Sequence, residues 1–163
     1  MKRLILMRHA KSSWDDPLLD DHARVLNGRG RASVDALGNW LRKKKYLPDQ
    51  ALVSDAARTR ETFARLGIIC ETKFEGALYL APAQRMMQVL KGASGKTVLM
   101  IGHNPGIAEF AEQIVGLTPD HTRFYDYPTG ATLVVEFDID DWSALRVNTG
   151  KVLDFVIPRE LTG

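Results

Sequence analysis

The stretch Leu4-Ile5-Leu6-Met7-Arg8-His9 decides the fold of this 163-residue chain. Its four apolar residues are too few for a helix, and such a run is typical of a strand buried on both faces of a sheet. Arg8 and His9 then lie at the carboxyl edge of that sheet, where open α/β sheets bind ligands. A guanidinium offers a planar fork of donors and an imidazole can be a nucleophile or an acid–base group, which indicates a phosphate site. The alternative is a strand that leaves the sheet through polar residues.

A second apolar run, over residues 51–53, stops at Ser54 and is followed by a predicted helix over 56–66. Arg58 and Arg60 lie in the first turns of this helix, where the amino terminus favours anions. Either arginine could enter the same site as Arg8. Surface ion pairing is the commoner fate of an arginine in such a position.

The clearest buried strand, residues 97–101, ends at Gly102-His103-Asn104-Pro105-Gly106. Pro105 suits the first turn of a following helix. A lone histidine at such a place is usually a satisfied polar group. Three strand ends that carry Arg-His, Ser with a nearby Arg, and His together indicate one site.

The remaining pattern is that of an α/β protein. Amphipathic helices are expected over residues 31–45 and 82–91, and after Pro105. Short strands are expected over residues 68–70, 131–137, 145–147 and 152–157, the last three in an antiparallel arrangement. Residues 77–79 read as a connecting segment, and residues 14–24 and 118–128 as loops.

Length and composition predict one domain over residues 1–163. A net charge of +2 is too small to indicate a nucleic-acid partner, and the single Cys70 fits a reducing compartment. There is no signal h-region and no apolar stretch of membrane-spanning length, so a cytoplasmic location and no membrane association are expected. The carboxylates of residues 15–21 lack a metal-ligand pattern, and neither a metal nor another cofactor is expected.

The ordered motifs resemble the histidine phosphatase superfamily, which includes the phosphoglycerate mutases. Four motifs are similar to those of the small bacterial phosphohistidine phosphatases of the SixA type, and the resemblance covers nearly the whole chain. They are Arg8-His9-Ala10-Lys11-Ser12, Arg24-x-Leu26-Asn27-x-x-Gly30, Gly102-His103-Asn104-Pro105-Gly106, and Pro128-Thr129-Gly130-Ala131.

This resemblance implies a three-layer α/β/α sandwich with a mostly parallel central sheet and without a cap subdomain. It implies that His9 is the nucleophile and that Arg8, Arg58 and His103 hold the phosphate; Arg58 matches the family position, four residues after the Ser, and Arg60 does not. Ser12, Arg24, Asp21 and Glu75 are candidates for the rim or for a general acid. No residue clearly matches the catalytic Glu of larger relatives, and Glu75 is better explained as an exposed loop carboxylate.

The expected activity is hydrolysis of phosphohistidine on a protein, for example a histidine-containing phosphotransfer domain, through a phosphohistidine intermediate at His9. A phosphoramidate leaves as neutral imidazole once protonated, so a missing acid is tolerable for that substrate. Two alternatives stay open. One is a phosphatase for small phosphomonoesters that uses Glu75 or an Asp of residues 15–21 as its acid; the other is a non-catalytic phosphate- or phosphoprotein-binding module.

Overall fold

The computed structural model describes residues 1–162, and within them a six-stranded sheet has the order β3-β2-β4-β1-β5-β6. Its strands are β1 (Lys2–Arg8), β2 (Gln50–Ser54), β3 (Glu71–Glu75), β4 (Thr97–Gly102), β5 (Thr132–Phe137) and β6 (Lys151–Val156). The first four strands run parallel, whereas β5 is antiparallel to β1 and β6 is antiparallel to β5. The predicted fold class, a mostly parallel sheet with antiparallel carboxyl-terminal strands, is confirmed.

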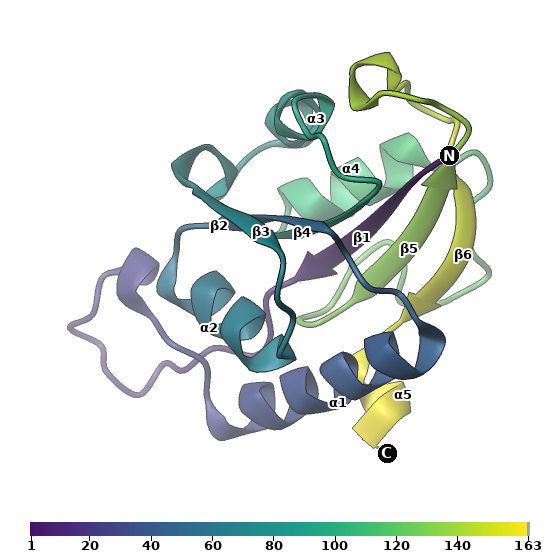
Figure 1. Cartoon of the computed structure of the whole chain (residues 1–163). Coiled ribbons are helices and arrows are strands. Elements are labelled where there is room, and N and C mark those ends of the chain that lie inside the picture. Colours follow the sequence, from purple (N-terminus) through teal and green to yellow (C-terminus); the bar gives the residue numbers. More distant parts are fainter. Residues whose placement is uncertain (163) are drawn as a thin grey trace.

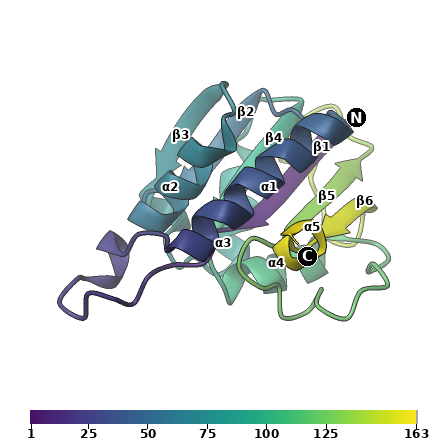
Figure 2. The same ribbon diagram turned by 90° about the horizontal axis from the view of Figure 1, so that it is seen from below.

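Helices cover both faces of the sheet (Figures 1 and 2). They are α1 (Gly28–Lys44), α2 (Ala57–Leu66), α3 (Ala83–Lys91), α4 (Gly106–Ile114) and α5 (Pro158–Thr162), with short 3-10 turns η1 (Asp21–Ala23), η2 (Gly76–Leu78) and η3 (Trp142–Ala144). Figure 1 shows α1, α2 and α5 below the sheet and α3 and α4 above it. The loop from β1 to α1 projects beyond the body of the molecule in both views.

Strand β1 lies at the centre of the two cores that these layers form. Leu4 and Leu6 pack with residues of α3 and α4, whereas Ile5 and Met7 pack with residues of α1 and α2. Successive side chains of a strand point to opposite faces of the sheet, and here both faces are covered by helices. All four side chains are therefore fully buried. Removing such a side chain from water contributes roughly 1.5–3 kcal/mol, which explains the continuous apolar run before Arg8.

The first turn of helix α1 packs against the segment that follows His9. Asn27 caps the helix, since its Oδ1 accepts from the Gly30 N–H at 2.8 Å. A Cβ at Gly30 would lie 2.1 Å from the Lys11 carbonyl oxygen. Only glycine permits this approach, and it fixes the start of α1 beside the residues that leave β1.

Two predicted extended segments were wrong. Residues 68–70 form a loop in which Ile69 is 99% exposed, and the strand is instead Glu71–Glu75, a polar edge strand paired only with β2. Glu75 is therefore the half-buried last residue of β3 and not a loop carboxylate. Leu145 to Val147 follow η3 without entering the sheet. Leu145 is buried there as a single residue, so a pattern of apolar residues misled the prediction.

Candidate active site

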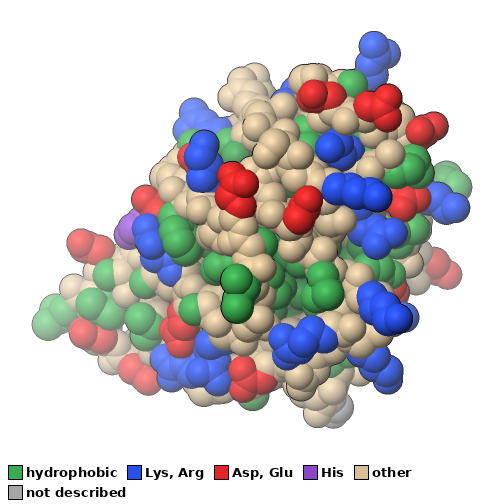
Figure 3. Space-filling model, in the orientation of Figure 1, with side chains coloured by type: hydrophobic (Ala, Val, Ile, Leu, Met, Phe, Trp, Pro, Cys, Tyr) green, Lys and Arg blue, Asp and Glu red, His purple; other side chains and the backbone are tan. Residues whose placement is uncertain are grey.

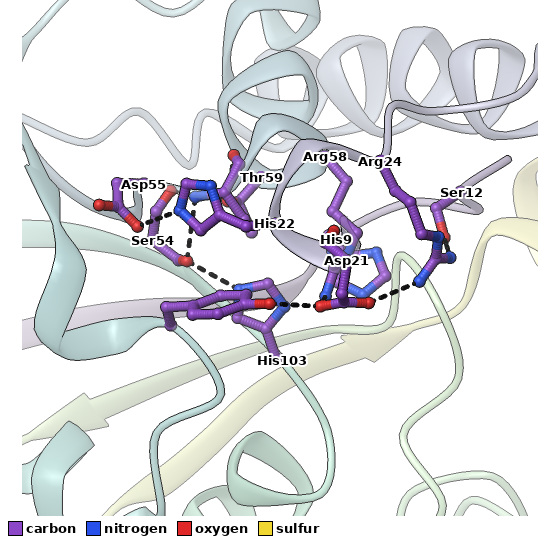
Figure 4. A network of polar contacts seen from close by, with 12 residues as sticks. His9, Ser12, Asp21, His22, Arg24, Ser54, Asp55, Arg58, Thr59 and His103 are labelled. Carbon is purple, nitrogen blue, oxygen red and sulfur yellow. Dashed lines mark hydrogen bonds and ion pairs between the residues drawn. The ribbon is translucent and has the colours of Figure 1, made fainter. Parts of the chain in front are cut away.

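The ends of three adjacent strands bring the site together. Strand β4 lies between β2 and β1. At its end, the Gly102 carbonyl accepts from the His9 N–H at 3.2 Å. The next residue, His103, has its Nε2 2.7 Å from Ser54 Oγ at the end of β2 (Figure 4). The two imidazole rings lie 5.3 Å apart between their centroids.

A pocket of about 180 Å³ opens at this edge. Its lining consists of Arg8, His9, Lys11, Ser12, Trp14, Arg24, Arg58, Leu80, His103, Asn104 and Thr129. The lining thus combines four cationic side chains with two imidazoles and contains no carboxylate. Such a pocket is suited to an anion with several acceptor oxygens.

His9 is held as a neutral imidazole with a defined tautomer. Its side chain is buried, with the residue 5% exposed, and Nδ1 lies 2.7 Å from the Ala10 carbonyl oxygen. A carbonyl can only accept, so Nδ1 carries the proton and Nε2 keeps its lone pair. Burial is the main cause that lowers the pKa of His9, to about 3. The hydrogen bond to Ala10 acts in the opposite direction, whereas the nearby His103, Arg8 and Arg58 lower the pKa further. At neutral pH the ring is therefore neutral, and the lone pair of Nε2 is available for attack on an electrophile.

His103 is the second neutral imidazole, and only 2% of its surface is exposed. Burial and then the charge of Arg58 lower the pKa of His103 to about 3. Its Nδ1 is buried and has no hydrogen-bond partner in residues 1–162.

Two of the three arginines that line the pocket, Arg8 and Arg58, each leave one buried donor unpaired. Arg8 Nη1 donates to the Tyr127 carbonyl oxygen at 3.2 Å. Arg58, 3% exposed, donates from Nη1 to the Asp21 carbonyl oxygen at 2.7 Å and from Nη2 to Asp21 Oδ2 at 3.0 Å. The Nε atoms of both arginines are buried and find no acceptor within the described part of the chain. Buried unpaired donors are costly, so their presence here is typical of a site made for a ligand.

Asp21 lies at the rim, where it connects two arginines and a tyrosine (Figure 4). Arg24 Nη1 reaches Asp21 Oδ1 at 2.8 Å, and Arg58 and the Tyr79 hydroxyl donate to Oδ2, the latter at 2.5 Å. The hydrogen bond from Tyr79 and the two arginines lower the pKa of Asp21 to about 2, despite the opposing effect of desolvation. Asp21 is therefore ionised at neutral pH and serves the rim as an anchor for the arginines.

Arg24 and Ser12 extend the rim on the other side. Arg24 Nη2 donates to Ser12 Oγ, and its guanidinium carbon lies 3.3 Å from the centroid of the Trp14 ring. Both Ser12 and Arg24 are buried and line the pocket.

Glu75 and Arg60 lie outside this pocket. Glu75 is opposite Ser54 in the β2–β3 pairing, but its Oε1 lies 3.9 Å from Lys73 Nζ, and it does not line the cavity. Arg60 donates from Nε to the Asp55 carbonyl oxygen at 2.8 Å and lies 4.2 Å from the centroid of the Phe74 ring. Residues 1–162 contain no cluster of three or more His, Cys, Asp or Glu side chains that could hold a metal ion.

Sequence reasoning missed Tyr79, which contacts the site through Asp21 and packs edge-on against His103 with ring centroids 5.4 Å apart. Its segment looked like a connection because no periodicity marks η2. The only signal available was an aromatic hydroxyl shortly after a strand end.

The fold and site define a class of α/β protein in which a histidine at the end of the first strand meets two arginines and a second histidine. The family model of the histidine phosphatase superfamily, branch 1, matches residues 4–75 of the chain. Those residues include Arg8, His9 and Arg58.

Solved structures of similar fold agree with this match. A candidate phosphohistidine phosphatase SixA from Nakamurella multipartitia is 25% identical, with a TM-score of 0.86 over 96% of each chain. The protein histidine phosphatase SixA, solved as a complex with tungstate, is 22% identical, with a TM-score of 0.76 over 98% of this chain and 99% of that one. The predicted similarity to the phosphohistidine phosphatases of the SixA type is confirmed.

A relative in sequence is an uncharacterized chloroplastic protein of Arabidopsis thaliana. It is 32% identical over 130 residues, or 71% of this chain. The matched region spans 60% of the plant protein's length. In this chain, none of the helices described has the length and apolar character needed to cross a membrane.

Proposed function

We propose that the protein is a phosphatase that hydrolyses phosphohistidine on a protein through a phosphohistidine intermediate at His9. The observation that carries the proposal is the pocket in which Arg8, Arg58 and His103 lie around a neutral His9 with no carboxylate in the lining. Guanidinium and imidazole N–H groups suit the non-bridging oxygens of a phosphoryl group. The SixA complex with tungstate, a tetrahedral oxyanion, is an example of this fold binding such an anion.

The reaction would proceed in two displacements. His9 Nε2 attacks phosphorus while the P–N bond to the substrate imidazole breaks, and the substrate nitrogen takes a proton from solvent. Water then attacks the phosphorus on His9, which releases inorganic phosphate and restores the neutral ring. The Arg8, Arg58 and His103 donors stabilise the negative charge that spreads over the equatorial oxygens in each step.

The pocket lining contains no carboxyl group to act as a general acid, which favours a phosphoramidate over an alkyl ester as the substrate. Asp21 is ionised, with its pKa near 2, and Glu75 is outside the pocket. An alkoxide needs protonation as it leaves, whereas a protonated imidazole leaves as a neutral molecule. Residues 1–162 also contain no inserted subdomain that covers the pocket. The pocket is therefore accessible to a phosphorylated side chain on the surface of another protein. The single Cys70, a free thiol, accords with a cytoplasmic location.

The test compares kcat/KM for a phosphohistidine protein, an aryl phosphate and an alkyl phosphate on one preparation. A phosphorylated histidine-containing phosphotransfer domain is a suitable protein probe. We expect the phosphohistidine to be hydrolysed fastest, the aryl phosphate at an intermediate rate and the alkyl phosphate slowest. The reason is that the need to protonate the leaving group increases in this order. An alkyl ester that equals or exceeds the phosphohistidine would show that an efficient acid exists, and the reading as a phosphatase for small phosphomonoesters would replace this one. No turnover of any probe would favour a phosphate-binding module.

A further inference from the structure

A second and larger hollow, of about 660 Å³, adjoins the phosphate pocket. It lies between the first turns of α1, the loop before β5 and the beginning of α5, which Figure 2 shows side by side. We call it the basic groove. Its volume falls in the range of about 300–1,000 Å³ that is typical of ligand sites.

The charge of the basic groove has one sign. Lys11, Arg29, Arg123 and Arg159 line it, and no Asp or Glu does. Arg123 is paired with Asp126, with Nε 2.9 Å from Oδ2, but no ion pair within residues 1–162 engages the other three. Figure 3 shows Lys and Arg side chains along the lower edge of the molecule, where α1 and α5 lie in Figure 1. Unpaired cations gathered in a concave surface favour an anionic partner.

The groove is continuous with the phosphate pocket. Lys11 and Thr129 line both cavities. Gly130, at φ +76°, donates its N–H to the carbonyl oxygens of Arg8 and His9 at 3.1 and 3.0 Å. A Cβ at Gly130 would lie 2.5 Å from Pro158 Cγ, so the end of β1 and the beginning of α5 are held closely against the same residue. The groove therefore has a fixed position relative to His9.

We propose that the basic groove binds an acidic segment of the phosphorylated protein, next to the phosphohistidine that the pocket holds. This inference rests on the proposed function. Apolar residues between the cations, Pro128, Ile157 and Pro158, suit a peptide chain with both carboxylates and apolar side chains. Nucleic acid is a poorer fit, because the lining offers no aromatic ring on which a base could stack.

The test uses the double variant Arg29→Glu/Arg159→Glu. Both residues are exposed and lie in first helical turns, where a carboxylate suits the helix dipole, so the fold should be retained. The matched control is Lys43→Glu/Arg85→Glu, which makes the same change of charge at exposed helical positions outside both cavities. The probes are two phosphohistidine peptides that differ only in four flanking residues, Asp and Glu in one and Asn and Gln in the other, with phosphoramidate as a small substrate.

We expect the wild-type protein and the control to prefer the acidic peptide by about tenfold in kcat/KM, which corresponds to about 1.4 kcal/mol. The groove variant should lose this preference while its rate with phosphoramidate stays within about twofold. An equal preference in groove variant and control would overturn the proposal, as would a wild-type protein that does not distinguish the peptides.

Binding of the unphosphorylated acidic peptide, followed by fluorescence anisotropy, separates this proposal from the proposed function. If the peptide binds the wild-type protein and not the groove variant, the groove assignment stands even if no phosphohistidine is hydrolysed. If citrate displaces the peptide at a similar concentration, or an RNA oligomer binds more tightly than the peptide, the groove recognises another anion and the proposal fails.

Discussion

Under the proposed function, Arg58 is held in position before the phosphoryl group binds. Two of its three guanidinium nitrogens are bonded to Asp21, at 2.7 and 3.0 Å, while Nε has no partner in the described chain. The Asp21 contacts hold the plane of the guanidinium, so little side-chain entropy remains to be lost when a phosphoryl oxygen binds. Asp21 is thus better understood as a positioning residue than as an acid.

Substitutions of Arg58 and of Arg60 should have different effects on activity. Arg58→Ala removes a buried charged donor, and losing one such donor typically lowers the rate on the order of a hundredfold or more. Arg60→Ala should change kcat/KM for phosphohistidine less than about threefold, because Arg60 contacts only Asp55 and Phe74 at the surface. Steady-state kinetics of the two variants, with circular dichroism to check folding, make the comparison. Equal losses would show that the wrong arginine has been assigned.

At the scale of elements, the short apolar runs predicted three of the strands well because each is buried on both faces. The Arg8-His9, Ser54 and His103 positions at their ends could be expected to meet for the same reason. Strand β3 could not be predicted in this way, since it is an edge strand with mostly exposed side chains. Asp21 was among the residues expected at the rim, but its contacts with Arg24, Arg58 and Tyr79 could not be predicted, because a polar loop has no periodicity that reveals where it returns to the body of the molecule.

Features of the whole molecule depend on tertiary packing and were beyond sequence reasoning. The basic groove joins Arg29 and Arg159, which are far apart in sequence and come together only because α5 packs on α1. The buried state of His9 and His103 is likewise a property of the assembled fold. It makes the stability of the protein depend on pH.

Both histidines have a pKa of about 3 in the folded protein, below the value of about 6.5 expected in the unfolded chain. As the pH falls below 6.5 the unfolded chain binds protons that the folded protein does not, so the free energy of unfolding should fall. The upper limit is about 1.4 kcal/mol per pH unit for each histidine. Urea unfolding at pH 7, 6 and 5 measures this slope. His103→Gln should make it shallower, and an unchanged slope would contradict the burial argument.

The proposed mechanism requires that His9 carry the phosphoryl group during turnover. The most direct measurement is rapid mixing with a phosphohistidine protein or an aryl phosphate, a quench in alkali that preserves phosphohistidine, and peptide mass spectrometry. We predict phosphate on His9 within the first turnover. The variant His9→Ala should keep the fold and lose both the adduct and nearly all activity. Phosphate trapped only on another residue, or full activity in His9→Ala, would contradict the account.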